Sequence, residues 1–98
     1  MIIHLQYFTE STSSGTFAVN TDAAFMGIMR QLLVSPATAS TTYNLTITDS
    51  DDLDIYCDTS ITGNYAPEVA IPVRGVYTVT IDSATADESF TIKLMVEE

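Results

Sequence analysis

The chain carries very little positive charge. Arg30, Arg74 and Lys93 are its only cationic residues, against 13 Asp and Glu, so the formal net charge is -10 over 98 residues. A protein of this charge is repelled by a phosphate backbone and by an anionic membrane surface. We therefore expect neither a nucleic acid nor a membrane among its partners.

Groups for covalent and metal chemistry are also scarce, because Cys57 is the only cysteine and His4 the only histidine. A single cysteine cannot form an intrachain disulfide, which suits synthesis in a reducing cytoplasm. Nucleophilic catalysis needs a base placed beside the nucleophile, and zinc needs three or four N or S ligands. Neither condition is met, so we expect no catalytic residues, no cofactor and no enzyme activity.

No apolar run is long enough to span a bilayer, and the first ten residues lack the basic region and the cleavage site of a signal peptide. Hydrophobic residues make up 46% of the chain and charged residues only 16%. With abundant Ser and Thr, this balance favours strands that have hydroxyl groups on their outer faces. The length fits one domain over residues 1–98.

The clearest pattern lies between Gly75 and Val96. Two runs alternate apolar and polar residues, with Tyr77, Val79 and Ile81 in the first and Phe90, Ile92 and Leu94 in the second. Period-two alternation predicts half-buried strands with these six residues inward. The polar segment Ser83–Ser89 between them predicts an antiparallel hairpin.

The middle of the chain shows the same period. Tyr43, Leu45 and Ile47 predict another strand, and residues 49–52 predict a turn because clustered Asp and Ser bond their own backbone. The further expectations are a return strand with Leu53, Ile55 and a buried Cys57 facing inward, and a loop over Ser60–Pro67. The short segment Val69–Val73, which contains Pro72, is expected to be either an edge strand or an extended crossing.

Residues 25–34 fit two structures. A strand would place Met26, Ile28, Leu32 and Val34 on one face with Arg30 as an exception, whereas Phe25, Ile28, Met29 and Leu32 have helical spacing. We favour the strand, because a small sandwich needs the extra pairing, and keep the helix as the alternative. The expected fold is all-β, a small antiparallel β-sandwich or jelly roll of about seven or eight strands.

The N-terminal segment is apolar on both faces if extended. It is expected to be either a terminal strand of the sandwich or an arm, within residues 1–10, that docks on a neighbouring chain. The residues expected at a partner interface are Ile2, Ile3, Leu5, Tyr7 and Phe8, together with Tyr65.

Four carboxylates crowd together at Asp49, Asp51, Asp52 and Asp54. Such an oxygen-rich loop is a weak candidate for calcium. An EF-hand loop would need an oxygen ligand at Leu53, a glycine at Asp54 and a Glu at Ser60, so a solvated acidic turn is the favoured interpretation.

Four segments carry a family resemblance. The runs Thr41–Asp49, Asp54–Tyr56, Pro72–Ile81 and Phe90–Leu94 resemble small bacteriophage virion proteins, namely capsid decoration (cement) proteins and related structural subunits. The same pattern also resembles the bacterial pre-peptidase C-terminal sandwich, which accompanies secreted enzymes. The apparent lack of a signal peptide and of an attached enzyme favours the first resemblance.

The virion resemblance implies a non-enzymatic sandwich on the outer surface of a phage capsid, made in the host cytoplasm. Its implied partners are the major capsid protein and further copies of itself as a homo-oligomer. The alternatives are another virion module, such as a tail, baseplate or head-fibre part, and a carbohydrate- or calcium-binding sandwich.

Overall fold

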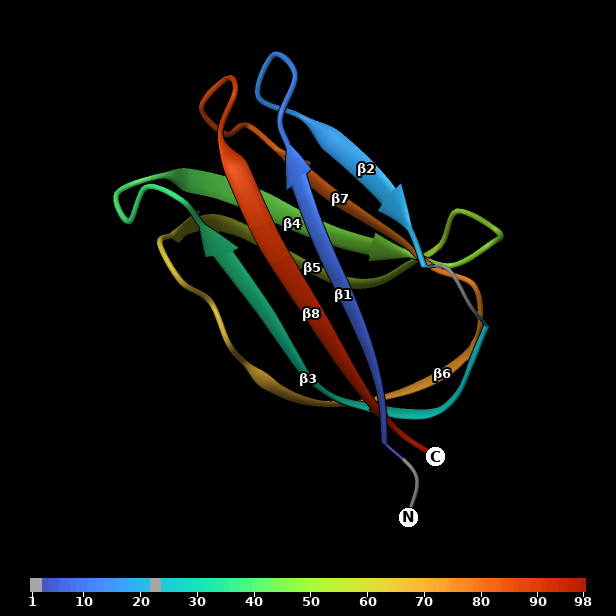
Figure 1. Cartoon of the computed structure of the whole chain (residues 1–98). Helices are drawn as coiled ribbons and strands as arrows, with labels where there is room; N and C mark the ends of the chain where they lie inside the picture. Colours follow the sequence, from blue (N-terminus) through green and yellow to red (C-terminus); the bar gives the residue numbers. More distant parts are fainter. Residues whose placement is uncertain (1–2, 22–23) are drawn as a thin grey trace.

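The computed structural model describes residues 3–21 and 24–98, which form two antiparallel four-stranded sheets packed face to face (Figure 1). The first sheet has the order β1 (Ile3–Ser11), β8 (Ser89–Glu97), β3 (Phe25–Pro36) and β6 (Glu68–Gly75). The second sheet has the order β2 (Phe17–Asn20), β7 (Thr78–Asp82), β4 (Thr42–Thr48) and β5 (Asp54–Thr62). Neither described range contains a helix that could cross a membrane.

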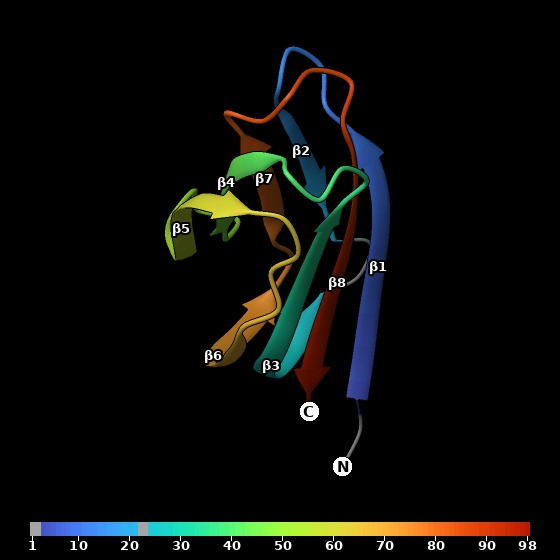
Figure 2. The same cartoon turned by 90° about the vertical axis from the view of Figure 1, so that its left-hand side faces the viewer.

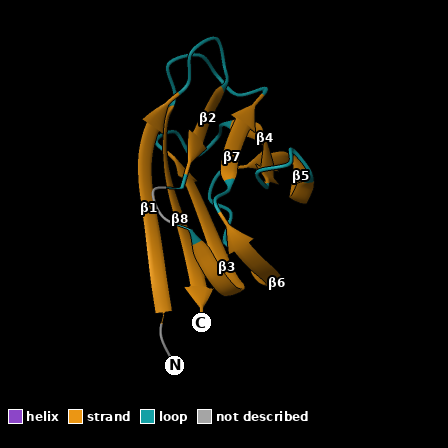
Figure 3. Ribbon diagram, turned by 90° about the vertical axis from the view of Figure 1, so that its right-hand side faces the viewer, coloured by secondary structure: helices purple, strands orange, loops and turns teal. Residues whose placement is uncertain are grey.

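The strand order is that of a rolled antiparallel ribbon. Strands β1 to β4 pair in turn with β8, β7, β6 and β5, and successive pairs lie in opposite sheets. This wrapping is the jelly-roll arrangement of two packed sheets. The all-β antiparallel sandwich expected from the sequence is therefore confirmed; Figure 2 and Figure 3 show the two layers from opposite sides.

The predicted C-terminal hairpin is wrong. Strands β7 and β8 belong to different sheets: Asp82 pairs with Asn44 on β4, and Ser89 pairs with Ser11 on β1. The connection between them crosses from one layer to the other instead of turning within a layer. Ser83 and Asp87 take positive φ angles of 56° and 58° in this crossing.

The inward faces of both strands were nevertheless predicted correctly. Val79, Ile81, Phe90, Ile92 and Leu94 are at most 1% exposed. They meet in the core between the sheets, as do buried residues of β3 and β4. Aromatic rings join the layers, since Tyr43 of β4 and Phe90 of β8 pack edge to face with centroids 5.0 Å apart, a favoured geometry for such pairs.

Residues 25–34 lie within the long strand β3, so the preferred strand prediction is confirmed. The expected face is wrong in its first half, because Met26 is 59% exposed whereas Met29 is fully buried. The cause is a β-bulge at Arg30, where the register with both neighbours shifts between Met29 and Gln31. The extra residue reverses the side to which later side chains point. Leu32 is therefore buried, as the strand prediction expected.

The return strand β5 also departs from its predicted face. Leu53 precedes the strand and is 63% exposed. Cys57 is exposed as well, although it was expected to be buried. Two register shifts against β4 disturb the alternation, and the strand continues to Thr62, inside the predicted loop. Ile61 supplies its buried side chain.

The loops at one end are held by a buried carboxylate. Glu88 is only 7% exposed, and its Oε2 accepts hydrogen bonds from the Thr41 hydroxyl at 3.2 Å and from the Thr38 N–H at 3.3 Å. Its own N–H donates to the Thr12 hydroxyl at 3.0 Å. Glu88 therefore ties the crossing between the sheets to the two neighbouring loops, a structural role that sequence pattern did not reveal.

Candidate contact surface

The three cationic residues of the chain all lie in the first sheet. Lys93 is on β8 between the buried residues Ile92 and Leu94, so it points to the outer face. Arg30 at the bulge of β3 and Arg74 on β6 are exposed. No strand of the second sheet contains Lys or Arg. A strongly acidic protein thus gathers its positive charge on one layer.

Arg30 forms an ion pair on this layer. Arg30 Nε is 3.5 Å from Glu97 Oε2, and both side chains are partly exposed, at 44% and 33%. Such surface pairs contribute only about 0–1 kcal/mol to stability. The pair therefore leaves Arg30 available to interact with a partner at little energetic cost.

Apolar side chains accompany the cations on the outer face. Leu5 is 58% exposed, and the register aligns it with Met95 of β8, then Gln31 of β3 and Glu68 of β6. Met95 is half-buried. This row crosses the whole sheet and mixes apolar, amide and carboxylate groups.

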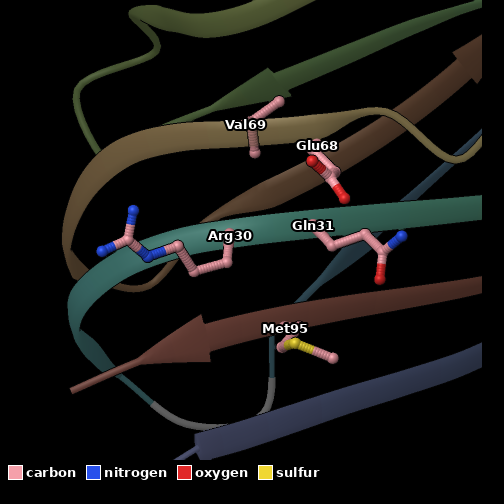
Figure 4. Close-up of a pocket in the computed structure, with 5 residues that line it drawn as sticks. All are labelled: Arg30, Gln31, Glu68, Val69 and Met95. Atoms are coloured by element: carbon pink, nitrogen blue, oxygen red, sulfur yellow. The ribbon is translucent and has the colours of Figure 1, made fainter.

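A hollow of about 290 Å³ opens on this row, and Figure 4 shows its lining residues Arg30, Gln31, Glu68, Val69 and Met95. The β-bulge of β3, at which the register between β3 and β6 shifts, lies at the same place. The volume is at the lower end of the range for small-molecule sites. The lining side chains include a cation, an anion, an amide and a thioether. The hollow can receive a partner side chain, but its lining contains no activated nucleophile.

The outer face of the second sheet is different, because its polar side chains bond to one another. Thr78 Oγ1 donates to Asn20 Oδ1 at 2.7 Å, and Asn44 Nδ2 donates to Asp82 Oδ1 at 2.9 Å. The hydroxyl oxygens of Thr42 and Thr62 are 3.0 Å apart. Side chains that satisfy one another across strands in this way leave few groups free for a partner.

The structure separates the residues expected at a partner interface. Ile3, Leu5, Tyr7 and Phe8 belong to β1, an edge of the first sheet, whereas Ile2 lies outside the described residues. Tyr65 bonds through its backbone to Val34 of β3, on the side of β3 away from β8 and β1. The β1 residues and Tyr65 therefore do not form one patch.

Tyr65 belongs to a separate polar cluster. Its hydroxyl donates to Asp58 Oδ2 at 2.7 Å and is also hydrogen-bonded to the Tyr56 hydroxyl. Desolvation, followed by these two hydrogen bonds, raises the pKa of Tyr65 above its ordinary value. Both rings pack against the core, so this cluster fastens the β5 edge and does not present a free aromatic platform.

The acidic turn uses a carboxylate internally. Asp49 Oδ1 accepts hydrogen bonds from the N–H groups of Asp51 and Leu53, at 2.9 and 3.0 Å, which is the self-bonded turn expected from the sequence. Within residues 3–21 and 24–98, no group of three or more His, Cys, Asp or Glu is arranged to hold a metal ion. Calcium binding by Asp49, Asp51, Asp52 and Asp54 stays an untested alternative to the favoured solvated turn.

Comparison of the sequence with protein-family models and with curated proteins finds no match. Solved structures do share the fold. A chain of the Bacillus endospore appendages, described as disulfide-linked pili, aligns with a TM-score of 0.63 and 12% identity over 97% of this chain and 86% of that one. A chain in the acid-stable capsid of Helicobacter pylori bacteriophage KHP30 aligns with a TM-score of 0.58, at the same identity and coverage.

A third similar structure is PliG from Aeromonas hydrophila, a periplasmic inhibitor of g-type lysozyme. It aligns with a TM-score of 0.58 and 11% identity over 94% of this chain and 86% of that one. At these identities the likeness establishes the fold and nothing finer. Phage, pilus and inhibitor proteins share the architecture, so the function of this chain has to be argued from its surface.

Proposed function

We propose that the protein is a non-enzymatic structural subunit of a phage virion, which sits on the outer surface of the capsid and stabilises it by binding major capsid subunits. The observation that carries this proposal is the asymmetry between the two outer faces. The first sheet combines all the cations of the chain with exposed apolar side chains such as Leu5 and Met26, whereas the polar side chains of the second sheet bond to one another.

This asymmetry suits one-sided attachment to a large assembly. A face with mixed charge and apolar groups can bind a partner surface, while the acidic remainder of the molecule stays in solvent and avoids packaged nucleic acid. Several modest contacts, made at once to neighbouring capsid subunits, would hold each copy firmly. The occurrence of the same fold in a chain of the KHP30 capsid supports a virion location.

The test is to mix the purified protein with expanded capsid shells that lack it. We expect the protein to co-sediment with the shells in a fixed ratio and to raise their melting temperature. Lys93→Gln removes a cation from the outer face of the first sheet and should weaken binding by about tenfold, equivalent to ~1.4 kcal/mol.

Thr80→Gln is the matched control, because Thr80 occupies the same kind of half-buried outward position on the second sheet. It should bind shells as the unaltered protein does. Protein that stays in solution with intact shells would refute the capsid assignment. Labelling on whole particles that marks the tail, baseplate or fibres would then assign the chain to another virion module.

A further inference from the structure

Three of the four edge strands of the sandwich carry features that discourage pairing with another chain. β6 contains Pro72, β5 has two register shifts against its neighbour, and β2 is only four residues long. Prolines, bulges and shortness are the usual protections of a sheet edge. β1 has none of them: its nine residues pair with β8 in unbroken register and include no proline.

The hydrogen bonds at the end of β1 show which backbone groups face its free edge. The N–H of Thr12, just after β1, donates to the Glu88 carbonyl at 2.9 Å. Residues of an antiparallel strand bond alternately to one side and the other. Even-numbered residues of β1 therefore bond to β8, and the backbone groups of Leu5, Tyr7 and Thr9 point to the free edge.

A contact on the other side of β8 gives the same assignment. The N–H of Ala37, after β3, donates to the Ser89 carbonyl at 2.8 Å. Odd-numbered residues of β8 thus bond to β3, which leaves the even-numbered ones for β1. The edge accordingly presents a regular row of backbone donors and acceptors to which a further strand could bond.

Charge and exposure suit a second copy of this chain at that edge. The first nine residues contain no Asp or Glu, although the chain as a whole has a net charge of -10. Two acidic molecules can therefore approach each other here without opposing carboxylates along the strand. Leu5 is 58% exposed in the middle of this segment and is aligned with Met95, so pairing there would bury apolar surface.

We propose that two copies associate through β1, antiparallel about a two-fold axis at Leu5. This register places Leu5 opposite Leu5 of the other copy and Ile3 opposite Tyr7, and its hydrogen bonds use only residues whose backbone groups point to the edge. The contact is isologous, so it closes as a dimer. The two first sheets become one continuous sheet, and their outer faces form a single, doubled platform.

The test uses the purified protein alone, so it is independent of the capsid proposal. We expect light scattering and sedimentation to show a monomer–dimer equilibrium that shifts toward dimer as salt rises, because salt screens the repulsion between two acidic copies. Tyr7→Pro removes an edge N–H without removing a bond to β8, and it should abolish the dimer while the circular-dichroism spectrum stays that of a β protein.

Thr9→Pro is the matched control, since it removes an N–H on the same side of β1 but beyond the Ile3–Tyr7 overlap. It should leave the dimer largely intact. In a Cys57→Ser background, Leu5→Cys should form a disulfide-linked dimer on oxidation, because Cα atoms of paired strands lie within disulfide reach. In the same background, Thr9→Cys should form far less disulfide-linked dimer on oxidation.

Two outcomes would overturn the proposal. One is a protein that stays monomeric at every concentration and salt level. The other is a monomer whose binding to shells is abolished by Tyr7→Pro but not by Thr9→Pro, which would mean that the edge receives a strand from another protein.

Discussion

The two outer faces of this sandwich cover the same core yet have opposite characters. On the second sheet, threonine, asparagine and aspartate side chains bond across the strands, as Asn44 does with Asp82. On the first sheet, Leu5 and Met26 are more than half exposed, and all the cations of the chain are found there. On the second sheet these polar side chains bond to one another, whereas the first sheet exposes apolar and cationic side chains to solvent.

The inward layers should not show this difference. Leu45 of the second sheet and Ile92 of the first are both at most 1% exposed. Leu45→Ala and Ile92→Ala should each lower the free energy of unfolding by roughly 2–5 kcal/mol, because each leaves a cavity in the same core. Urea unfolding measures both; a loss below about 1 kcal/mol for one of them would show that its sheet contributes less to the core than the other.

Alkaline pH should destabilise the fold through Tyr43 of the second sheet. Burial raises the pKa of Tyr43 from 10.0 to about 12, and its hydroxyl donates to the Gly63 carbonyl at 2.8 Å. Because the folded pKa is the higher one, the stability it brings is complete below pH 10 and is lost as pH rises through about 12. The Tyr43→Phe variant should have a lower free energy of unfolding than the unaltered protein at neutral pH. Between pH 9 and 12, urea unfolding should show that the variant loses less of its stability than the unaltered protein does. The raised pKa of Tyr65 contributes equally in both proteins.

The smallest expected effects compare the outer faces directly. Asn44→Ala removes hydrogen bonds to Asp82 and to the Ser60 N–H and should cost about 1 kcal/mol of unfolding free energy without changing partner binding. Arg30→Ala breaks the surface ion pair with Glu97, so it should cost under about 1 kcal/mol but should weaken binding to shells. Equal effects of both variants on stability and on binding would contradict the division of roles.

Alternation in the sequence predicted which side chains are buried but not which strands are neighbours. The inward residues of β7 and β8 were identified because burial requires only the right period. Their pairing was not, because the polar segment 83–89 can equally turn within a sheet or cross between sheets. Its path depends on distant contacts, such as that of Glu88 with Thr41, which leave no local pattern.

Bulges account for most of the remaining errors within strands. Arg30 stood out as a charged residue on an otherwise apolar face, and that exception marks the bulge in β3. Cys57 gave no comparable signal, since the register shifts that expose it lie between β5 and β4. The asymmetry of the outer faces was hidden for the same reason as the pairing: Lys93, Arg30 and Arg74 are far apart in the sequence and meet in one sheet only after the ribbon has rolled.

The rolled ribbon also determines when the molecule can finish folding. Ile3 pairs with Glu97, so β1 cannot complete its sheet until β8, the last of the eight strands along the chain, has been synthesised. Contacts this distant along the chain slow folding, and an unpartnered β1 would be exposed to other chains throughout synthesis. The strand best suited to self-association in the native protein is thus also the one most in need of protection while the protein is being made.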